Sequence, residues 1–374
     1  MDGERSKMII NKYFYKVFFI LFIFFVSISN TGFSQSIEEL KIAAQTGDSK
    51  AQFELGKLYF DGKSIPRNIP EAIRLWKEAG NKGEVGAQIY LSLCYSKGTG
   101  VERDLKEALL WKTKAANRGN PIGQTMLAEH YMLGLEIEKD EGKAFDLYLK
   151  AADTGFPDAF MPLGKCYIDG IGTEINVPEG IKWYEKAGEA GNIYTQTYLT
   201  LYYSLKENQD FDIQKSFYWA LKAAEKNSTD MQILVGAYYL RGIGTNKNET
   251  EGLKWLVPLA ESGNPKAAKQ LARYYSDIKM FDDAVKWFEV AAINGDIESY
   301  GDVTFIYYNE LAGAKKDAYR WAELGAAKGE FYCIFVQGEI FYNNGEKEKG
   351  LELIREAANK GSKPAKEFLE KLSI

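Results

Sequence analysis

The sequence predicts an all-α fold, a solenoid of about nine helix-turn-helix repeats of 32–36 residues. Two observations predict it. Glycine recurs at intervals of 36 residues, and each of these glycines ends a segment with helical periodicity. Between them, a tyrosine and a leucine or valine return at constant offsets. A fixed period of this length is typical of stacked helix pairs, each of which buries its apolar face only against its neighbours.

The closing residues of the repeats define the period. Asn227 replaces glycine once, because asparagine also tolerates the left-handed backbone at a helix end. Later intervals shorten to 32 or 34 residues. The series is Gly47, Gly83, Gly119, Gly155, Gly191, Asn227, Gly263, Gly295, Gly329 and Gly361.

The first helix of each repeat, helix A, follows the closing residue. Counting that residue as zero, position 8 is Leu or Val in eight repeats, position 12 is Tyr or Phe, and position 9 is always small. These positions share one helix face, and small side chains there predict the close approach of another helix backbone. Helix A starts at a capping Asn before Pro in Asn120-Pro121 and Asn264-Pro265.

The second helix, helix B, carries every tryptophan of the chain. Six of the seven stand eight residues before the closing position, and Trp76 is one place out of step. This regular placement predicts core side chains. Between the helices, Gly-x-Gly recurs at 98–100, 170–172 and 242–244, and three copies at the same place in a repeat indicate a turn, not a phosphate-binding loop.

The combined pattern of Ala-x-x-x-Leu-Gly-x-x-Tyr, Gly-x-Gly-Val, Ala-x-x-Trp and Ala-Ala-x-x-Gly resembles Sel1-like repeats. "AQFELGKLYFDG" and "KGTGVERDLKEALLWKTKAANRG" carry it most clearly. The resemblance implies a tetratricopeptide-like, right-handed α/α superhelical solenoid and a protein-binding scaffold of the kind found in many bacterial envelopes. We expect no cofactor. The expected repeats are 48–83, 84–119, 120–155, 156–191, 192–227, 228–263, 264–295, 296–329, 330–361 and a terminal half-repeat 362–374, together forming a solenoid over 35–374.

The amino terminus has the three-part order of a secretory signal. Basic residues precede the apolar run 17–26, and small or polar residues follow. We therefore expect a signal peptide at 1–34 and an exported, monomeric protein, periplasmic, extracellular or at the cell surface, without membrane insertion after cleavage. An uncleaved membrane anchor is the alternative, although the apolar run is shorter than the ~20 residues that span a bilayer.

Composition and spacing argue against other classes. The net charge of −5 and the absence of a basic stripe argue against nucleic acid as a partner.

Cys94, His130 and Cys166 share position 11 of successive repeats. Neighbouring helices lie about 8–10 Å apart, too far for a shared metal, and two repeat steps are too far for a disulfide. We expect no metal, and three free thiols, in contrast to exported Sel1-like proteins with a cysteine pair in each repeat.

Catalysis finds no support in the residue pattern. One histidine and no pairing of a nucleophile with a base predict no catalytic residue, so we expect a scaffold or adaptor for envelope signalling, assembly or secretion. Acid pairs need no histidine. An envelope enzyme or enzyme subunit acting on cell-wall peptides or glycans therefore remains the alternative.

A partner-binding face is expected on helix A at positions 3, 7, 10 and 14, opposite the packed positions. In a superhelix of the kind that the resemblance implies, this face lines the concave side. It is apolar in repeats two, three, five and six, and repeat four interrupts it with Asp158, Lys165 and Asp169. This predicts a groove over repeats two to six for a peptide or helix of a partner protein. The alternative is that neighbouring helices bury part of the face. Pro162 should kink helix A of repeat four. The predicted binding residues are Tyr90, Leu93, Met126, Tyr194, Tyr198, Leu201 and Leu234.

A column of glutamines occupies position 5 beside the core: Gln52, Gln88, Gln124, Gln196 and Gln232. These amides could hydrogen-bond an extended peptide, or they could fasten neighbouring helices to one another. Because position 5 borders the packed face, fastening is the favoured interpretation.

Overall fold

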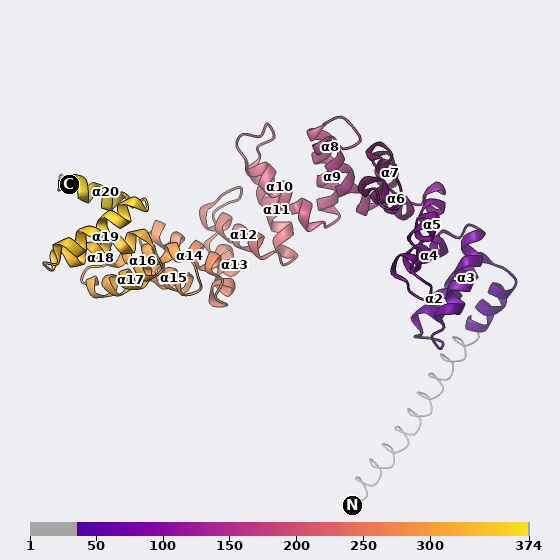
Figure 1. The fold of residues 1–374 in the computed structure, drawn as a ribbon, viewed down its shortest axis with the longest axis horizontal. Coiled ribbons are helices and arrows are strands. Elements are labelled where there is room, and N and C mark those ends of the chain that lie inside the picture. The colour runs from indigo at the N-terminus through magenta and orange to yellow at the C-terminus, as the bar shows by residue number, and fades with distance from the viewer. Residues whose placement is uncertain (1–35, 373–374) are drawn as a thin grey trace, which may run out of the picture. The chain divides into compact units, whose positions relative to one another are not determined.

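The computed structural model describes residues 36–372, whose regular secondary structure is entirely helical (Figure 1). The chain divides into two units, Met1–Ala187 and Gly188–Ile374. The expected signal segment, 1–34, lies outside the described residues.

The first unit begins with a helix at 36–45 and continues in helix pairs. Helix α9 crosses into the second unit. The elements are α2 (Ser49–Asp61), α3 (Ile69–Asn81), α4 (Val85–Lys97), α5 (Leu105–Asn117), α6 (Pro121–Leu133), α7 (Glu141–Asp153), the 3₁₀ turn η1 (Pro157–Ala159), α8 (Phe160–Asp169) and α9 (Val177–Glu189).

The second unit repeats the plan. Its helices are α10 (Ile193–Ser204), α11 (Ile213–Glu225), α12 (Thr229–Arg241), α13 (Glu249–Glu261), α14 (Pro265–Asp277), α15 (Phe281–Ile293), α16 (Ile297–Asn309), α17 (Lys315–Ala327), α18 (Phe331–Asn343), α19 (Lys347–Asn359) and α20 (Lys363–Lys371).

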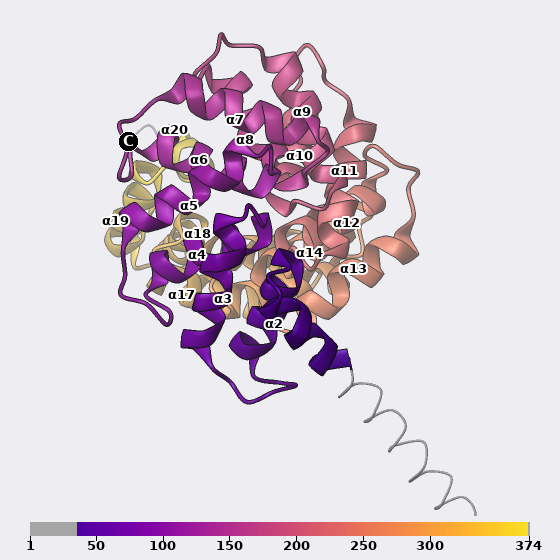
Figure 2. The ribbon, with the colours of Figure 1, turned by 90° about the vertical axis from the view of Figure 1, so that its right-hand side faces the viewer.

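Packing follows chain order within each unit. The two helices of a repeat pack together, as in α4 with α5, and helix B packs on the next helix A, as in α5 with α6. The same order holds from α10 to α20. The ribbons of α10, α11, α12 and α13 follow one another in Figure 2. The all-α repeat class expected from the sequence is confirmed.

Helix boundaries are set by local hydrogen bonds. In repeat two, the Asp104 side chain accepts from the backbone N–H of Lys106 and Glu107 at 3.0 Å and caps α5. The backbone N–H of Asp104 donates to the carbonyl of Tyr95, 3.0 Å away, and closes the loop between α4 and α5. Asn227 has φ of 64°, the left-handed backbone expected at its position.

Small residues let helix A and helix B touch at their backbones. A Cβ on Gly350 of α19 would meet the Gly338 carbonyl oxygen of α18 at 2.7 Å. A Cβ on Gly180 of α9 would likewise meet the Gly164 carbonyl oxygen of α8 at 2.7 Å. The close approach predicted at position 9 is confirmed, and its partner on helix B is also a small residue in these repeats.

Tryptophan fills the core from helix B, as the sequence indicates. Trp76 is completely buried and its Nε1–H donates to the Phe53 carbonyl, 3.1 Å away. Trp255 alone among the seven is half-buried. The fully or almost fully buried tryptophans are Trp76, Trp111, Trp183, Trp219, Trp287 and Trp321.

The Gly-x-Gly loops are turns with two separate tasks. The first glycine ends helix A in left-handed backbone, as Gly170 does with φ of 70°. The second glycine contacts the start of helix B in the preceding repeat: a Cβ on Gly172 would collide with the backbone carbonyl of Glu141 in α7. The loop glycines therefore cap one helix and seat the loop on another.

Helix A of repeat four begins with a 3₁₀ turn. Pro162 is the third residue of α8, which begins at Phe160 after the 3₁₀ turn η1. A proline in the first turn of an α-helix removes an N–H that needs no helical acceptor. Pro162 therefore lies just after the change from 3₁₀ turn to α-helix and not in the interior of α8. A kink at this point stays a prediction.

Candidate partner-binding surface

Large apolar side chains stand exposed on helix A at the positions that the core does not use. In the first unit, Leu93 is 40% exposed on α4. In the second unit, Tyr194, Leu201 and Leu205 are 60%, 56% and 51% exposed. We call Tyr194, Tyr198, Leu201 and Leu205, on or directly after α10, the central surface.

Position 7 of helix A is half-buried in repeats two to six, whereas position 14 of the same repeats is exposed. The ring of Tyr90 lies 4.8 Å from Trp76 and 5.6 Å from Phe53, both from repeat one, measured between ring centroids. Met126 is half-buried, and Leu234 packs against the core of its own unit. Neighbouring helices therefore cover part of the predicted face, which was the alternative considered from the sequence.

The central surface is held by aromatic contacts within α10. The rings of Tyr198 and Tyr202 stack with centroids 6.3 Å apart and planes 13° from parallel. The Tyr202 hydroxyl donates to the Asp210 carboxylate at 2.8 Å. Burial, together with that hydrogen bond, raises the pKa of Tyr202 to about 12. Tyr198 is thus supported from one side, while Tyr194 and Leu201 face solvent.

The glutamine column fastens helices to one another. Nε2 of Gln88 donates to the Gly80 carbonyl at 2.8 Å, and Nε2 of Gln196 donates to the Gly188 carbonyl at 2.7 Å. Each acceptor lies eight residues earlier, near the end of the preceding helix B, where carbonyls lack a helical partner. Because these glutamines are buried, they are not placed to bind a peptide.

The position-11 column is buried. Cys94 and Cys166 are free thiols, as is Cys333, and burial raises the pKa of both Cys94 and Cys166 to about 11. Within residues 36–372, no group of three His, Cys, Asp or Glu side chains is placed to hold a metal ion.

His130 is bonded in a way that sequence reasoning missed. Its Nε2 lies 2.6 Å from Nζ of Lys112 on α5, and its Nδ1 lies 2.9 Å from the Leu135 carbonyl. With Nδ1–H donating, Nε2 accepts from the lysine. Burial lowers the pKa of Lys112, although the carboxylates of Glu129 and Glu136 oppose this effect. The contact joins helix B of one repeat to helix A of the next, a pairing that residue spacing alone did not indicate.

None of the helices in the described part of the chain is both long enough and apolar enough to cross a membrane.

Comparisons with known proteins agree with the helical repeats. A family model described as Sel1 repeat matches residues 49–84, 85–120, 121–156, 163–192, 203–228, 229–264 and 279–296, more than half of the chain. The protein is similar to c5321, a protective antigen of uropathogenic Escherichia coli strains displaying an SLR fold, with 28% identity, 88% of this chain and 73% of that chain covered, and a TM-score of 0.70. It is also similar to a Sel1 repeat protein from Oxalobacter formigenes, with 24% identity, coverage of 60% and 99%, and a TM-score of 0.49.

Proposed function

Because the chain belongs to the Sel1 repeat family, which generally provides protein-interaction scaffolds, we propose that it is an exported scaffold that binds a peptide or helix of a partner protein. It would act in envelope signalling, assembly or secretion. The binding face includes the predicted residues of helix A, and the central surface on α10 is its main anchor.

The observation that carries this proposal is the exposure of Tyr194, Leu201 and Leu205. Tyr194 and Leu201 lie on α10 two turns apart, Leu205 directly follows this helix, and none of the three side chains fills the core. Large apolar residues that gather in one exposed place are the usual mark of an interaction site, and an aromatic anchor with aliphatic neighbours suits a helix or an extended segment.

The test is capture of binding proteins from an envelope extract with two variants of the protein. Tyr194→Ser/Leu201→Ser/Leu205→Ser should lose the captured partner while helical content and melting temperature stay nearly unchanged. Ile293→Ser is the matched control, because Ile293 is 71% exposed but lies at the end of helix B. Equal capture by the triple variant and the wild type would refute this surface, and equal loss in both variants would point to non-specific adhesion.

Export is supported by the order of basic, apolar and small residues in 1–34. The similar Escherichia coli protein is described as a protective antigen, which agrees with an exported protein. Amino-terminal sequencing of the protein from its native cells should find a chain that begins near Gln35. A chain that retains the apolar run would instead support the membrane anchor.

A further inference from the structure

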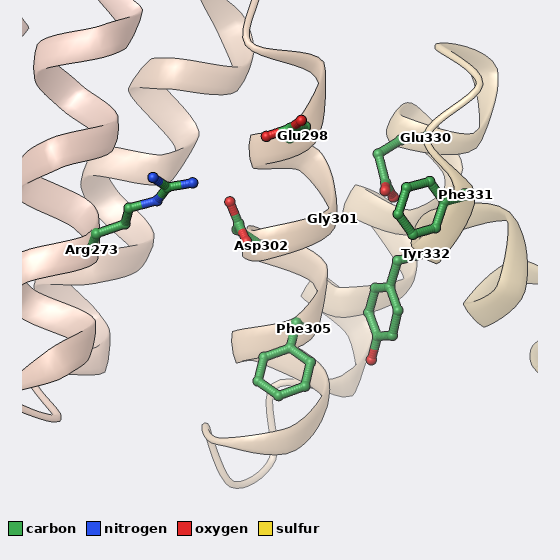
Figure 3. Close-up of a pocket in the computed structure, with 8 residues that line it drawn as sticks. All are labelled: Arg273, Glu298, Gly301, Asp302, Phe305, Glu330, Phe331 and Tyr332. Atoms are coloured by element: carbon green, nitrogen blue, oxygen red, sulfur yellow. The ribbon is translucent and has the colours of Figure 1, made fainter. Parts of the chain in front are cut away.

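A pocket of about 320 Å³ opens on the helix A face of repeats seven to nine, between α14, α16 and α18 (Figure 3). It shares no residue with the central surface. Its volume is at the low end of the ~300–1,000 Å³ typical of ligand sites. Gly301 lines the pocket without a side chain, and a Cβ at that position would meet the Glu330 carboxylate at 2.8 to 3.0 Å. The absence of a side chain at Gly301 thus leaves room for the Glu330 carboxylate.

Negative charge predominates in the lining. Glu298, Asp302 and Glu330 contribute three carboxylates, and Arg273 is the single cationic side chain among the lining residues. Glu298 is already paired with Lys269, 2.7 Å away. Glu330 is almost completely buried and accepts from the backbone N–H of Cys333 at 2.7 Å, as the N-cap of α18.

Asp302 differs from the other two acids because its carboxylate makes no hydrogen bond or ion pair with any described residue. It sits at position 7 of α16, where earlier repeats place Tyr90, Met126 and Leu234. Figure 3 shows it pointing into the space toward Arg273. Burial raises the pKa of Asp302 to about 6, and the nearby cations Lys269 and Arg273 only partly offset this effect. The Asp302 oxygens are not among the buried side-chain atoms without a partner, so they remain accessible to a ligand in the pocket.

Aromatic rings form the apolar part of the pocket. Phe305 and Phe331 are exposed, and the Phe305 and Tyr332 rings lie 5.9 Å apart between centroids. Ring faces attract cations, and their edges cover aliphatic stems. A carboxylate beside several rings is thus complementary to an ammonium or guanidinium group on an alkyl chain.

We propose that this pocket binds the cationic side chain, lysine or arginine, of a partner protein segment, with Asp302 as the counter-ion and Phe305, Phe331 and Tyr332 around the stem. The proposal rests on the proposed function only in taking the ligand to be part of a protein. Arg273 lies across the pocket and competes with the ligand for Asp302.

The test uses the peptide acetyl-Gly-Gly-Lys-Gly-Gly-amide and saturation-transfer NMR on the purified protein. Two matched peptides carry norleucine, which keeps the stem and removes the charge, or glutamate, which reverses the charge. The lysine peptide should show at least fivefold more transfer than either. Asp302→Asn should reduce its signal at least fivefold, Arg273→Gln should maintain or increase it, and Glu298→Gln, the control at an acid already paired, should change it less than twofold.

The pH response adds a second measurement. Transfer to the lysine peptide should fall between pH 7 and pH 5 as Asp302 gains its proton, and Asp302→Asn should show no such fall. Asp302→Asn should also be at least as resistant to urea as the wild type at pH 7, which separates lost binding from lost folding.

Three results would overturn the proposal. The first is equal transfer to the norleucine and lysine peptides, and the second is stronger transfer to the glutamate peptide that is lost in Arg273→Gln. The third is no transfer to the lysine peptide even when its concentration is 10-fold higher than that of the other two peptides. Because the central surface is tested with different variants, loss of the captured partner in the α10 variant would stand even if the pocket failed.

Discussion

The glycine pair at the crossing of α18 and α19 allows a prediction of both sign and size. Gly350→Ala adds one methyl group that would meet the Tyr342 backbone nitrogen at 2.6 Å and the Gly338 carbonyl oxygen at 2.7 Å. Both neighbours are backbone atoms of α18, so no side-chain rotation can make room. The helices must move apart, and the contacts around the crossing weaken with them.

The expected loss can be bounded. Overpacking of a tight core site costs about 1–3 kcal/mol, whereas Ala in place of Gly inside a helix returns roughly 0.5–1 kcal/mol. Gly350→Ala should therefore lower the free energy of unfolding by about 0–2.5 kcal/mol, with a midpoint near 1 kcal/mol that corresponds to roughly 2–4 °C in melting temperature for a unit of this size. Gly338→Ala should act at the same crossing, and the double variant should lose less than the sum of the two losses.

Gly142→Ala is the matched control, because Gly142 also lies on a helix B but its added Cβ would meet only an Asp140 oxygen at an ordinary 3.5 Å. It should leave stability unchanged or raise it slightly. Circular dichroism melting gives the total effect. Hydrogen exchange over α18 and α19 locates it, since repeat proteins can open locally. If Gly350→Ala melts no lower than Gly142→Ala, the backbone contact is not the reason for these glycines.

Three further predictions concern buried polar groups. The three thiols should all react with a thiol reagent in denaturant and hardly at all in the folded protein, because burial raises their pKa values; fewer than three in denaturant would mean a disulfide. Gln196→Leu should lower the free energy of unfolding by about 0.5–1.5 kcal/mol in urea titrations, since it removes one of two hydrogen bonds to the buried Gly188 carbonyl, which still accepts from the Gly191 N–H at 2.9 Å; no change would mean that the second hydrogen bond is sufficient. Burial lowers the pKa of Lys112 in the folded protein below its unfolded value near 10.4. At a pH between the folded and the unfolded pKa, the unfolded chain binds more protons than the folded one. The contribution of Lys112 to stability therefore rises with pH over this range. Lys112→Met should lack this rise when urea midpoints are compared from pH 8 to pH 10, and equal slopes would contradict a depressed pKa.

The repeat architecture could be predicted from the sequence because its signals are local and periodic. The small residues at position 9 indicated where helix A approaches another helix, and the regular spacing of the tryptophans indicated core positions on helix B. The late start of α8 could not be foreseen in the same way. Whether Pro162 falls in the first turn or in the interior depends on where the helix begins, and η1 shifts that start.

The binding face was only partly predictable. The period placed Tyr194 and Leu201 on the outer side of α10, but it could not show that Tyr90 packs on Trp76, which depends on the distance between neighbouring helices. The pocket was missed because the outer face of repeat seven has the ordinary composition of a wetted helix. The outer face of repeat eight has Asp302 at position 7 and Phe305 at position 10, an acid beside a ring that could have been noticed.

The contact between a Gly-x-Gly loop and helix B of the preceding repeat limits how the sequence can evolve. Gly172 contacts Glu141, and Gly244 contacts Ile213. In both cases the contacted residue lies at the start of helix B in the preceding repeat. Duplication or loss of a complete 36-residue unit recreates the same contact between loop and helix B. Gain or loss of a few residues shifts the loop glycine away from its contact and breaks it. Recombination in the gene can therefore lengthen or shorten the array in whole repeats, and new binding specificities can arise by reshuffling units whose outer faces differ.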